Sequence, residues 1–291
     1  MTSFGLHFFK NPGTKYPYSD TIFYRNYESV FANNVYKRDR DTYRVMNCME
    51  RLLILIKGFK EIKGKYIDYF SCLTGKKVVP VGPLVQDPIL DNEDYEIMEW
   101  LNKKEKGSAI FVSFGSEYFL KNEDMEEIAH GLELSNVNFI WVVRFPKGEK
   151  IVLEEALPKG FLNRVGERGF VVKGWAPQAK ILNHPSVGGF SIKFGLPIIA
   201  MPMHLDQPIN ARLIKEVGAG VEVLRNSKGK LHRERMAETI NLVMKEVSGE
   251  YVKKKVRELR EKIEFKEDEE IDEVVKELVL LCVNKKNGFH N

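Results

Sequence analysis

Short hydrophobic runs alternate with polar, helix-like stretches through the central part of the chain. Each run is bounded by polar residues, Gly or Pro, which is typical of strands buried on both faces of a parallel sheet. The runs are Ala109–Phe114, Phe139–Val143, Gly169–Gly174, Pro197–Pro202 and Val221–Leu224. From about residue 230 onward the chain is charged and its pattern is helical, with an apolar face over residues 271–281. Strands that alternate with helices predict an α/β doubly wound parallel sheet.

The first part of the chain is rich in aromatic residues and less regular. The pattern predicts a strand at Leu52–Ile56, a helix over residues 58–69 and another strand beginning at Val78. Asn122, followed by acidic residues, is a plausible N-cap of a helix in the regular part. We expect a shorter, incomplete Rossmann-like domain over residues 1–84. A proline-containing linker follows over residues 85–92, a complete α/β domain over residues 93–265, and a C-terminal helix and tail over residues 266–291.

Composition argues against several classes of partner. The chain has 291 residues, 45 Lys and Arg, and 41 Asp and Glu, and the two signs are interleaved. A nucleic-acid-binding or membrane-binding protein usually has a one-sided basic surface, so neither partner is expected. The three cysteines fit neither a disulfide framework nor a metal-binding spacing, and no targeting or membrane-spanning segment stands out. These features predict a cytoplasmic protein without a bound metal.

Candidate binding residues follow three of the predicted strands. Ligands of open α/β sheets lie beyond the carboxyl ends of the strands. A Gly-Ser turn ending at Ser116 could approach a phosphate, Trp175 before a proline offers a flat face for a base, and Gln178 can both donate and accept hydrogen bonds. Asp206 and Gln207 together could hold several sugar hydroxyls. Each feature alone has an ordinary reading as a turn, core packing or a surface pair.

In combination, these pieces resemble the signature of plant family 1 UDP-glycosyltransferases. The resemblance rests on Trp175-Ala-Pro-Gln, on His184-Pro-Ser-Val-Gly-Gly and on Asp206-Gln207, and it extends over nearly the whole chain. The branch that adds sugar to sugar is the most similar. The resemblance implies a glycosyltransferase B-type fold, a role in plant secondary metabolism and inverting transfer of a hexose, with glucose favoured, from a UDP-sugar to a small plant glycoside or aglycone. It implies a monomer that needs no cofactor beyond its UDP-sugar donor substrate.

The resemblance also assigns roles to individual residues. Trp175 would stack on uracil, while Ala176 and Gln178 would contact the uridine. Ser116 would contact the diphosphate, and Asp206 with Gln207 would hold the donor sugar. His184 and His204 flank the signature, but they lack the companions of a metal site and are expected to make structural hydrogen bonds.

The signature is shortened near residue 191. Family members follow Gly-Gly-Phe with a segment whose His, Asn, Ser and Glu hold the diphosphate and ribose, whereas here Phe190 leads within a few residues to Pro197. If the runs at residues 187–190 and 198–201 formed neighbouring parallel strands, a crossover of about a dozen residues would be needed. The pairing must therefore change, or the sheet must be disturbed there. Hydrogen bonds to charged groups contribute about 1.5–3 kcal/mol each, so losing several weakens donor binding on the order of a thousandfold.

A second departure concerns the catalytic base. In the family it is a histidine near the start of the N-terminal half, and none of the six histidines of this sequence matches that position, His7 included. Because a positioned general base contributes about 10²–10⁴ in rate, we expect no catalytic residue and an impaired or inactive enzyme. Two alternatives stay open. The chain could be a non-catalytic nucleotide-binding remnant, or an incomplete gene product whose native form is longer and active.

Overall fold

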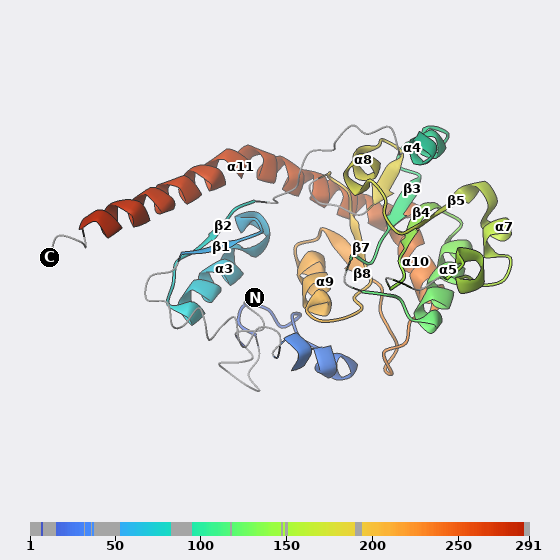
Figure 1. Ribbon diagram of the computed structural model, residues 1–291, viewed down its shortest axis with the longest axis horizontal. Helices are drawn as coiled ribbons and strands as arrows, with labels where there is room; N and C mark the ends of the chain where they lie inside the picture. The colour runs from blue at the N-terminus through green and yellow to red at the C-terminus, as the bar shows by residue number, and fades with distance from the viewer. Residues whose placement is uncertain are drawn as a thin grey trace. The chain divides into compact units, whose positions relative to one another are not determined.

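The computed structural model describes residues 7, 16–31, 33–35, 37, 53–82, 95–116, 118–146, 148, 151–189 and 194–287 (Figure 1). The chain divides into two compact units. One comprises Met1–Gln86 with Leu259–Asn291, and the other comprises Asp87–Glu258. The boundary at the C-terminal side lies inside helix α11 (Val247–Asn287), earlier than the expected limit at residue 265, so the end of the chain belongs with the N-terminal unit. The expected linker over residues 85–92 lies outside the described residues.

The first unit is built on a small parallel βαβ element. Its described elements are η1 (Asn26–Glu28), β1 (Ile54–Ile56), α3 (Lys60–Thr74) and β2 (Val78–Pro80). Strand β1 pairs in parallel with β2, and the apolar side of α3, including Phe70, packs on Val78. From α11 the carboxylate of Glu270 accepts the backbone N–H of Lys60 at 3.1 Å. This carboxylate therefore satisfies one of the free N–H groups at the start of α3.

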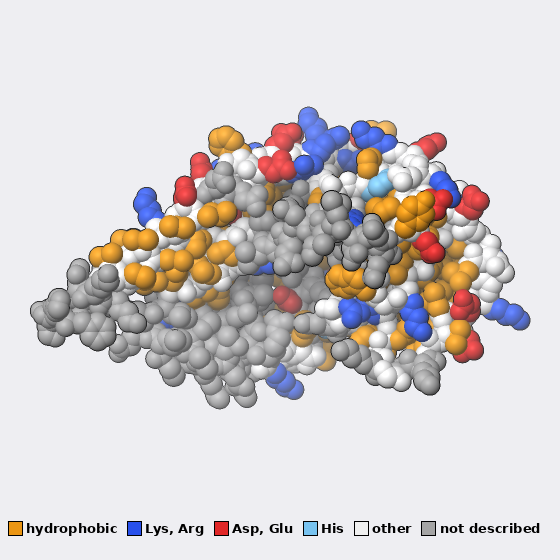
Figure 2. Space-filling view, turned by 45° about the horizontal axis from the view of Figure 1, so that its top comes forward, with side chains coloured by type: hydrophobic (Ala, Val, Ile, Leu, Met, Phe, Trp, Pro, Cys, Tyr) orange, Lys and Arg blue, Asp and Glu red, His pale blue; other side chains and the backbone are white. Residues whose placement is uncertain are grey.

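Most apolar side chains in the C-terminal half of α11 are exposed. Figure 2 shows hydrophobic side chains gathered along this part of the helix. Those at least 38% exposed are Ile271, Val275, Leu278, Val279, Leu280, Leu281 and Val283. Within the described part of the chain, no helix is long and apolar enough to cross a membrane.

The second unit alternates strands and helices as expected. In chain order it contains α4 (Tyr95–Asn102), β3 (Ala109–Val112), α5 (Asn122–Ser135), β4 (Asn138–Val143), α6 (Leu153–Ala156), α7 (Phe161–Val165), η3 (Gly166–Arg168), β5 (Gly169–Lys173), α8 (Gln178–Asn183), β6 (Val187–Gly189), β7 (Ile198–Ala200), α9 (Gln207–Glu216), β8 (Gly220–Glu222) and α10 (Arg233–Met244). Every predicted hydrophobic run overlaps a strand, and the predicted α/β class is confirmed.

The proposed N-cap of α5 is wrong by one residue. Lys121 has extended dihedral angles and occupies the N-cap, while Asn122 is the first helical residue. Lys121 is the N-cap because the first helical hydrogen bond runs from the N–H of Met125 to the carbonyl of Lys121 at 2.9 Å. The acidic residues after Asn122 still lie in the first turn, where the helix dipole favours them.

Alternating residues of the sheet face two hydrophobic layers. On one face Ile110, Phe139 and Trp141 pack with α5, α7 and α10. On the other face Phe111 and Ile140 pack with α4 and α8. Both faces are covered, which is why the strands are apolar at nearly every position.

The strand order shows a parallel sheet that is divided in two. Four strands pair in the order β5-β4-β3-β6, and β7 pairs separately with β8. Placed side by side, the two parts follow the 3-2-1-4-5-6 order of a doubly wound sheet, with the division between the fourth and fifth positions. Among the described residues β6 pairs only with β3, through Val187 and Gly189, and no ladder joins β6 to β7. We expected either a changed pairing or a disturbed sheet at this point, and the division of the sheet agrees with that expectation.

Candidate functional site

The loop after β3 turns sharply at a glycine. Gly115 has a φ of +78°, a left-handed conformation that other residues rarely adopt, and its N–H donates to Oγ of Ser113 at 3.4 Å. The next residue, Ser116, is exposed. The hydroxyl of Ser116 is thus available to a ligand at the carboxyl end of a central strand.

The loop after β5 holds an exposed tryptophan on a fixed backbone. Gly174 has a φ of +95° and donates its N–H to the carbonyl of Val143 at 2.8 Å, which anchors the loop to the end of β4. The side chain of Trp175 is 78% exposed, whereas Ala176 is buried in the core. Gln178 begins α8 and is exposed. The buried alanine fixes the loop, and the indole and the amide face solvent.

The loop after β7 is organised by the side chain of Gln207. Its Oε1 accepts the backbone N–H of Met203 at 2.8 Å and that of His204 at 3.4 Å. Asp206 occupies the N-cap position of α9 but makes no capping bond with its side chain, and Nδ2 of Asn210 donates to its Oδ2 at 3.4 Å. The Asp-Gln pair is therefore held at the start of a helix by its own neighbours.

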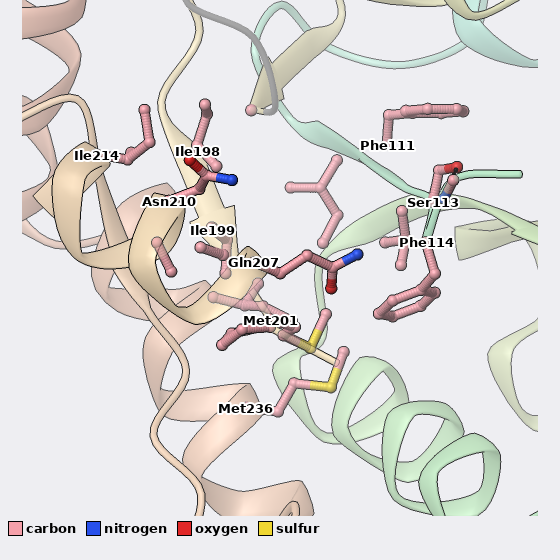
Figure 3. Close-up of a pocket in the computed structure, with 18 residues that line it drawn as sticks. Phe111, Ser113, Phe114, Ile198, Ile199, Met201, Gln207, Asn210, Ile214 and Met236 are labelled. Atoms are coloured by element: carbon pink, nitrogen blue, oxygen red, sulfur yellow. Dashed lines mark hydrogen bonds between the residues drawn. The ribbon is translucent and has the colours of Figure 1, made fainter. Parts of the chain in front are cut away.

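A cavity of about 340 Å³ lies where the sheet divides, and we call it the sheet-split cavity (Figure 3). Its described lining residues are Ile110–Gly115, Gly189, Ile198–Pro202, Gln207, Asn210, Ala211, Ile214, Met236 and Ile240. Of the six predicted binding residues, Gln207 alone is among them. The cavity brings this side chain together with Ser113 and Gly115 at the end of β3.

Ser116 and Asp206 directly adjoin the lining residues Gly115 and Gln207, whereas the three predicted residues after β5 lie apart from the sheet-split cavity. Trp175, Ala176 and Gln178 follow β5, which is separated from β3 by β4. Two strand spacings of about 4.8 Å place the end of β5 roughly 10 Å from the end of β3. That separation suits an extended ligand that crosses several strand ends. It does not suit a compact one.

Two features near Gln207 were not anticipated as functional. Asn210 contacts Asp206 and lines the cavity, and its position four residues after Asp206 on a helix was the available signal. The rings of Tyr118 and His204 lie 4.8 Å apart, and Nδ1 of His204 is buried without a hydrogen-bond partner among the described residues. Burial, followed by the nearby charge of Asp124, raises the pKa of the Tyr118 hydroxyl. No feature of the sequence indicated this contact between Tyr118 and His204.

His184 makes the structural hydrogen bonds expected of it. Its Nε2 lies 3.1 Å from Oδ1 of Asn102, and its Nδ1 accepts the backbone N–H of Ser186 at 3.2 Å. Burial lowers the pKa of the imidazole, which favours the neutral form that this pattern requires. Within the described ranges, no group of three or more His, Cys, Asp or Glu side chains is arranged to hold a metal ion.

Comparison with known proteins gives a consistent result. A family model described as "UDP-glucoronosyl and UDP-glucosyl transferase" matches residues 78–262. UDP-glucosyltransferase 29 of Panax ginseng is 51% identical over 98% of this chain, and a mogroside IIIx synthase of Siraitia grosvenorii is 49% identical over 97% of it. The chain spans 67% and 64% of the lengths of these two relatives.

Solved structures of plant transferases share the fold. The crystal structure of a UGT transferase from Siraitia grosvenorii in complex with UDP has a TM-score of 0.72 and 29% identity. That match covers 85% of this chain and 64% of the other. The structure of apo UGT2 from Phytolacca americana has a TM-score of 0.73 and 25% identity, and covers 94% of this chain and 68% of the other.

Proposed function

The chain belongs to the UDP-glucoronosyl and UDP-glucosyl transferase family, and from this we propose that it binds a UDP-hexose across the carboxyl ends of its strands, but weakly. The claim that binding is weak rests on the division of the sheet between β6 and β7. The activity that we assign to the protein is transfer of a hexose to a plant glycoside or aglycone. The short connection between β6 and β7 impairs this transfer in the present chain.

The uridine end of the donor is assigned to the loop after β5. Trp175 offers an exposed indole on a loop that Gly174 anchors to β4, so stacking on uracil requires little rearrangement. Stacking of a base on an aromatic side chain contributes about 1–3 kcal/mol. Gln178 and the backbone around Ala176 lie beside the indole in sequence and supply the polar contacts to the uridine.

The sugar end is assigned to Asp206 and Gln207. Because Oε1 of Gln207 already accepts two backbone N–H groups, the N–H groups of Nε2 are the ones that remain for a sugar hydroxyl. The carboxylate of Asp206 accepts hydrogen bonds from sugar hydroxyls. Gln207 favours glucose as the donor sugar.

The diphosphate is the weakly held part of the donor. Ser116 is the single side chain that we assign to it, and the family segment that would follow β6 is absent from the sequence. In an open α/β sheet a helix N-terminus after a central strand supplies N–H groups to phosphate. After β6 the chain passes to β7 through residues 190–197, too short a segment for such a helix and crossover.

The acceptor class is proposed from the relatives. Their names include β-D-glucosyl crocetin β-1,6-glucosyltransferase and cyanidin-3-O-glucoside 2-O-glucuronosyltransferase, both of which act on glycosides. We therefore assign a sugar hydroxyl of a small plant glycoside as the acceptor. The protein is proposed to act as a cytoplasmic monomer with no resident cofactor or metal.

A graft tests the proposal directly. Replacing residues 191–197 with the corresponding longer segment of the Panax ginseng relative should restore the crossover. Calorimetric titration with UDP should show weak binding to the native chain and binding on the order of a thousandfold tighter to the graft. Trp175→Ala in the graft should weaken UDP binding again, whereas Tyr251→Ala, an exposed aromatic on α11, should not. Equal UDP affinity of the native chain and the graft would overturn the proposal.

A second candidate is nucleotide binding without transfer, and the divided sheet favours it over full activity. The two candidate functions differ in whether the chain transfers sugar. Incubation of the chain with UDP-glucose and a glycoside acceptor should give no product above background. Product formation that Asp206→Ala abolishes would establish an active transferase instead.

A further inference from the structure

The sheet-split cavity lies between the part of β3 beyond its pairing with β6 and the edge of β7 that has no ladder partner among the described residues. Strand β3 pairs with β6 only through Ala109 and Ile110, so its later residues border the cavity on one side. Strand β7 pairs with β8 and presents its other edge to the cavity. The cavity thus occupies the space beyond the end of β6, and it lies wholly within the second unit.

The lining of this cavity is apolar. Isoleucine, valine, phenylalanine, methionine and alanine side chains from β3, β7, α9 and α10 supply most of it, and none of the described lining residues carries a charge. Burying a phosphate group here would cost its hydration without an opposite charge to replace it. The cavity is therefore a poor site for the diphosphate of a nucleotide sugar and a suitable one for an uncharged molecule.

Its volume limits the size of the occupant. An engineered apolar cavity of about 150 Å³ binds benzene. The sheet-split cavity, at about 340 Å³, is roughly twice as large and falls within the range of small-molecule sites. A volume of this size corresponds to about two fused rings.

Three polar side chains reach the cavity and define where a polar group of the occupant lies. Figure 3 shows the amides of Gln207 and Asn210 extending from α9 into the space opposite Ser113 and Phe114. The backbone N–H groups of Met203 and His204 already engage Oε1 of Gln207. Among the described residues none accepts a hydrogen bond from Nε2 of Gln207, so this group is available as a donor to a buried acceptor.

We propose that the sheet-split cavity is a binding site for a small, uncharged two-ring compound that carries one hydrogen-bond acceptor. The rings fill the space between β3 and β7, and the acceptor oxygen receives a hydrogen bond from Nε2 of Gln207. Burial of the apolar rings supplies the affinity, and the amide fixes the orientation. The amide donor is the one that the proposed function assigns to the donor sugar, so the two ligands compete for Gln207. The site is separate from the uracil stack on Trp175 and does not depend on the diphosphate.

The probe is 1-tetralone, a two-ring ketone, compared with its parent hydrocarbon tetralin and with charged naphthalene-1-sulfonate. In calorimetric titration of the full chain, 1-tetralone should bind with a negative heat-capacity change and raise the melting temperature. Tetralin should bind about fivefold more weakly, since it lacks the acceptor. The sulfonate should not bind. Failure of both 1-tetralone and tetralin to bind would overturn the proposal.

Variants locate the binding. Ala211→Phe places a ring in the cavity and should abolish binding of 1-tetralone, while Ala179→Phe on α8, outside the lining, should leave it unchanged. If Ala211→Phe does not fold, Ala200→Val fills part of the same space and should weaken binding severalfold. Retained binding in a folded Ala211→Phe variant would contradict the assignment.

The role of Gln207 has its own test. Gln207→Glu keeps the oxygen that accepts from Met203 but removes the N–H donors. The preference for 1-tetralone over tetralin should disappear. An undiminished preference would show that another group holds the ketone. UDP titration of the same samples separates this result from the proposed function, because loss of UDP binding leaves the tetralone measurements intact.

Discussion

Arg233, the first residue of α10, binds the carboxylate of Glu127 on α5 with both its backbone and its guanidinium group. Its backbone N–H donates to Oε2 of Glu127 at 2.7 Å, and its Nε donates to Oε1 at 3.1 Å. His232 holds the N-cap position of α10 without a side-chain capping bond, so Glu127 supplies the cap from another helix. This relationship joins two helices that cover the same face of the sheet.

Removal of the Glu127 carboxylate should destabilise the second unit. Glu127→Ala takes away both the cap and the ion pair and is expected to cost about 1–2 kcal/mol, whereas Glu127→Gln keeps one acceptor oxygen and should cost less. Denaturant unfolding measures the difference. Glu123→Ala, an exposed neighbour on α5, is the matched control and should be nearly neutral.

The same pair predicts a dependence on pH. Hydrogen bonds from Arg233 hold the pKa of Glu127 below its ordinary value. A carboxyl whose folded-state pKa is lowered stabilises the fold above its unfolded pKa of about 4.3, and this contribution is lost as the pH falls through the folded value. The stability gap between the native chain and Glu127→Ala should therefore be full at pH 7 and close on acidification below pH 4. A gap that is independent of pH would contradict this explanation.

Two adjacent glycines of β6 should respond differently to alanine. A Cβ on Gly188 would lie 2.4 Å from the carbonyl oxygen of Gly107 and 2.9 Å from Cε of Met244, and a backbone oxygen cannot easily move away. A Cβ on Gly189 would lie 3.5 Å from the oxygen of Pro197, an ordinary contact. Gly188→Ala is expected to lower stability by about 2 kcal/mol or more, and Gly189→Ala by less than about 1 kcal/mol.

Thermal melts followed by circular dichroism compare the two variants on one scale. Similar melting temperatures for Gly188→Ala and Gly189→Ala would show that β6 shifts freely beside β3. That result would also weaken the view of β6 as a fixed member of the four-stranded sheet.

Replacement of Glu270 by glutamine should stabilise the fold at neutral pH. Its side chain is buried, Oε1 accepts the N–H of Lys60, and Oε2 has no hydrogen-bond partner among the described residues. Burial raises the pKa of this carboxyl, and the charge of Glu61 adds to the effect against the opposing contributions of Lys60. A raised carboxyl pKa means that stability falls as the pH rises from the unfolded value of about 4.3 through the folded value.

Glu270→Gln keeps the cap on Lys60 and removes the buried charge, so it should raise stability at pH 7 by about 1 kcal/mol and have no effect below pH 4. Glu270→Ala loses the cap and should not give this gain. Melting temperatures across pH 4–8 check both. A lower stability of Glu270→Gln at pH 7 would mean that the carboxylate is stabilised in the fold.

Several features of the site were readable from the sequence, and others were not. The runs that became β3, β4 and β5 were recognisable because burial on both faces makes a strand apolar throughout. Trp175 and Gln207 stood out through the resemblance and lie after β5 and β7. The contact of Tyr118 with His204 was not readable, since it joins side chains far apart in the sequence.

The sequence by itself determined which segments form the main strands, which family signature the chain carries, and that residues 190–197 are too few for a crossover between parallel neighbours. Only the tertiary structure decided how the sheet accommodates this short connection. The ladder ends at β6 and resumes at β7 with β8, and an apolar cavity remains between the two parts. The reason is physical. The local hydrophobic pattern indicates which segments form strands. Strand pairing, by contrast, depends on which distant segments can reach one another once the helices are packed.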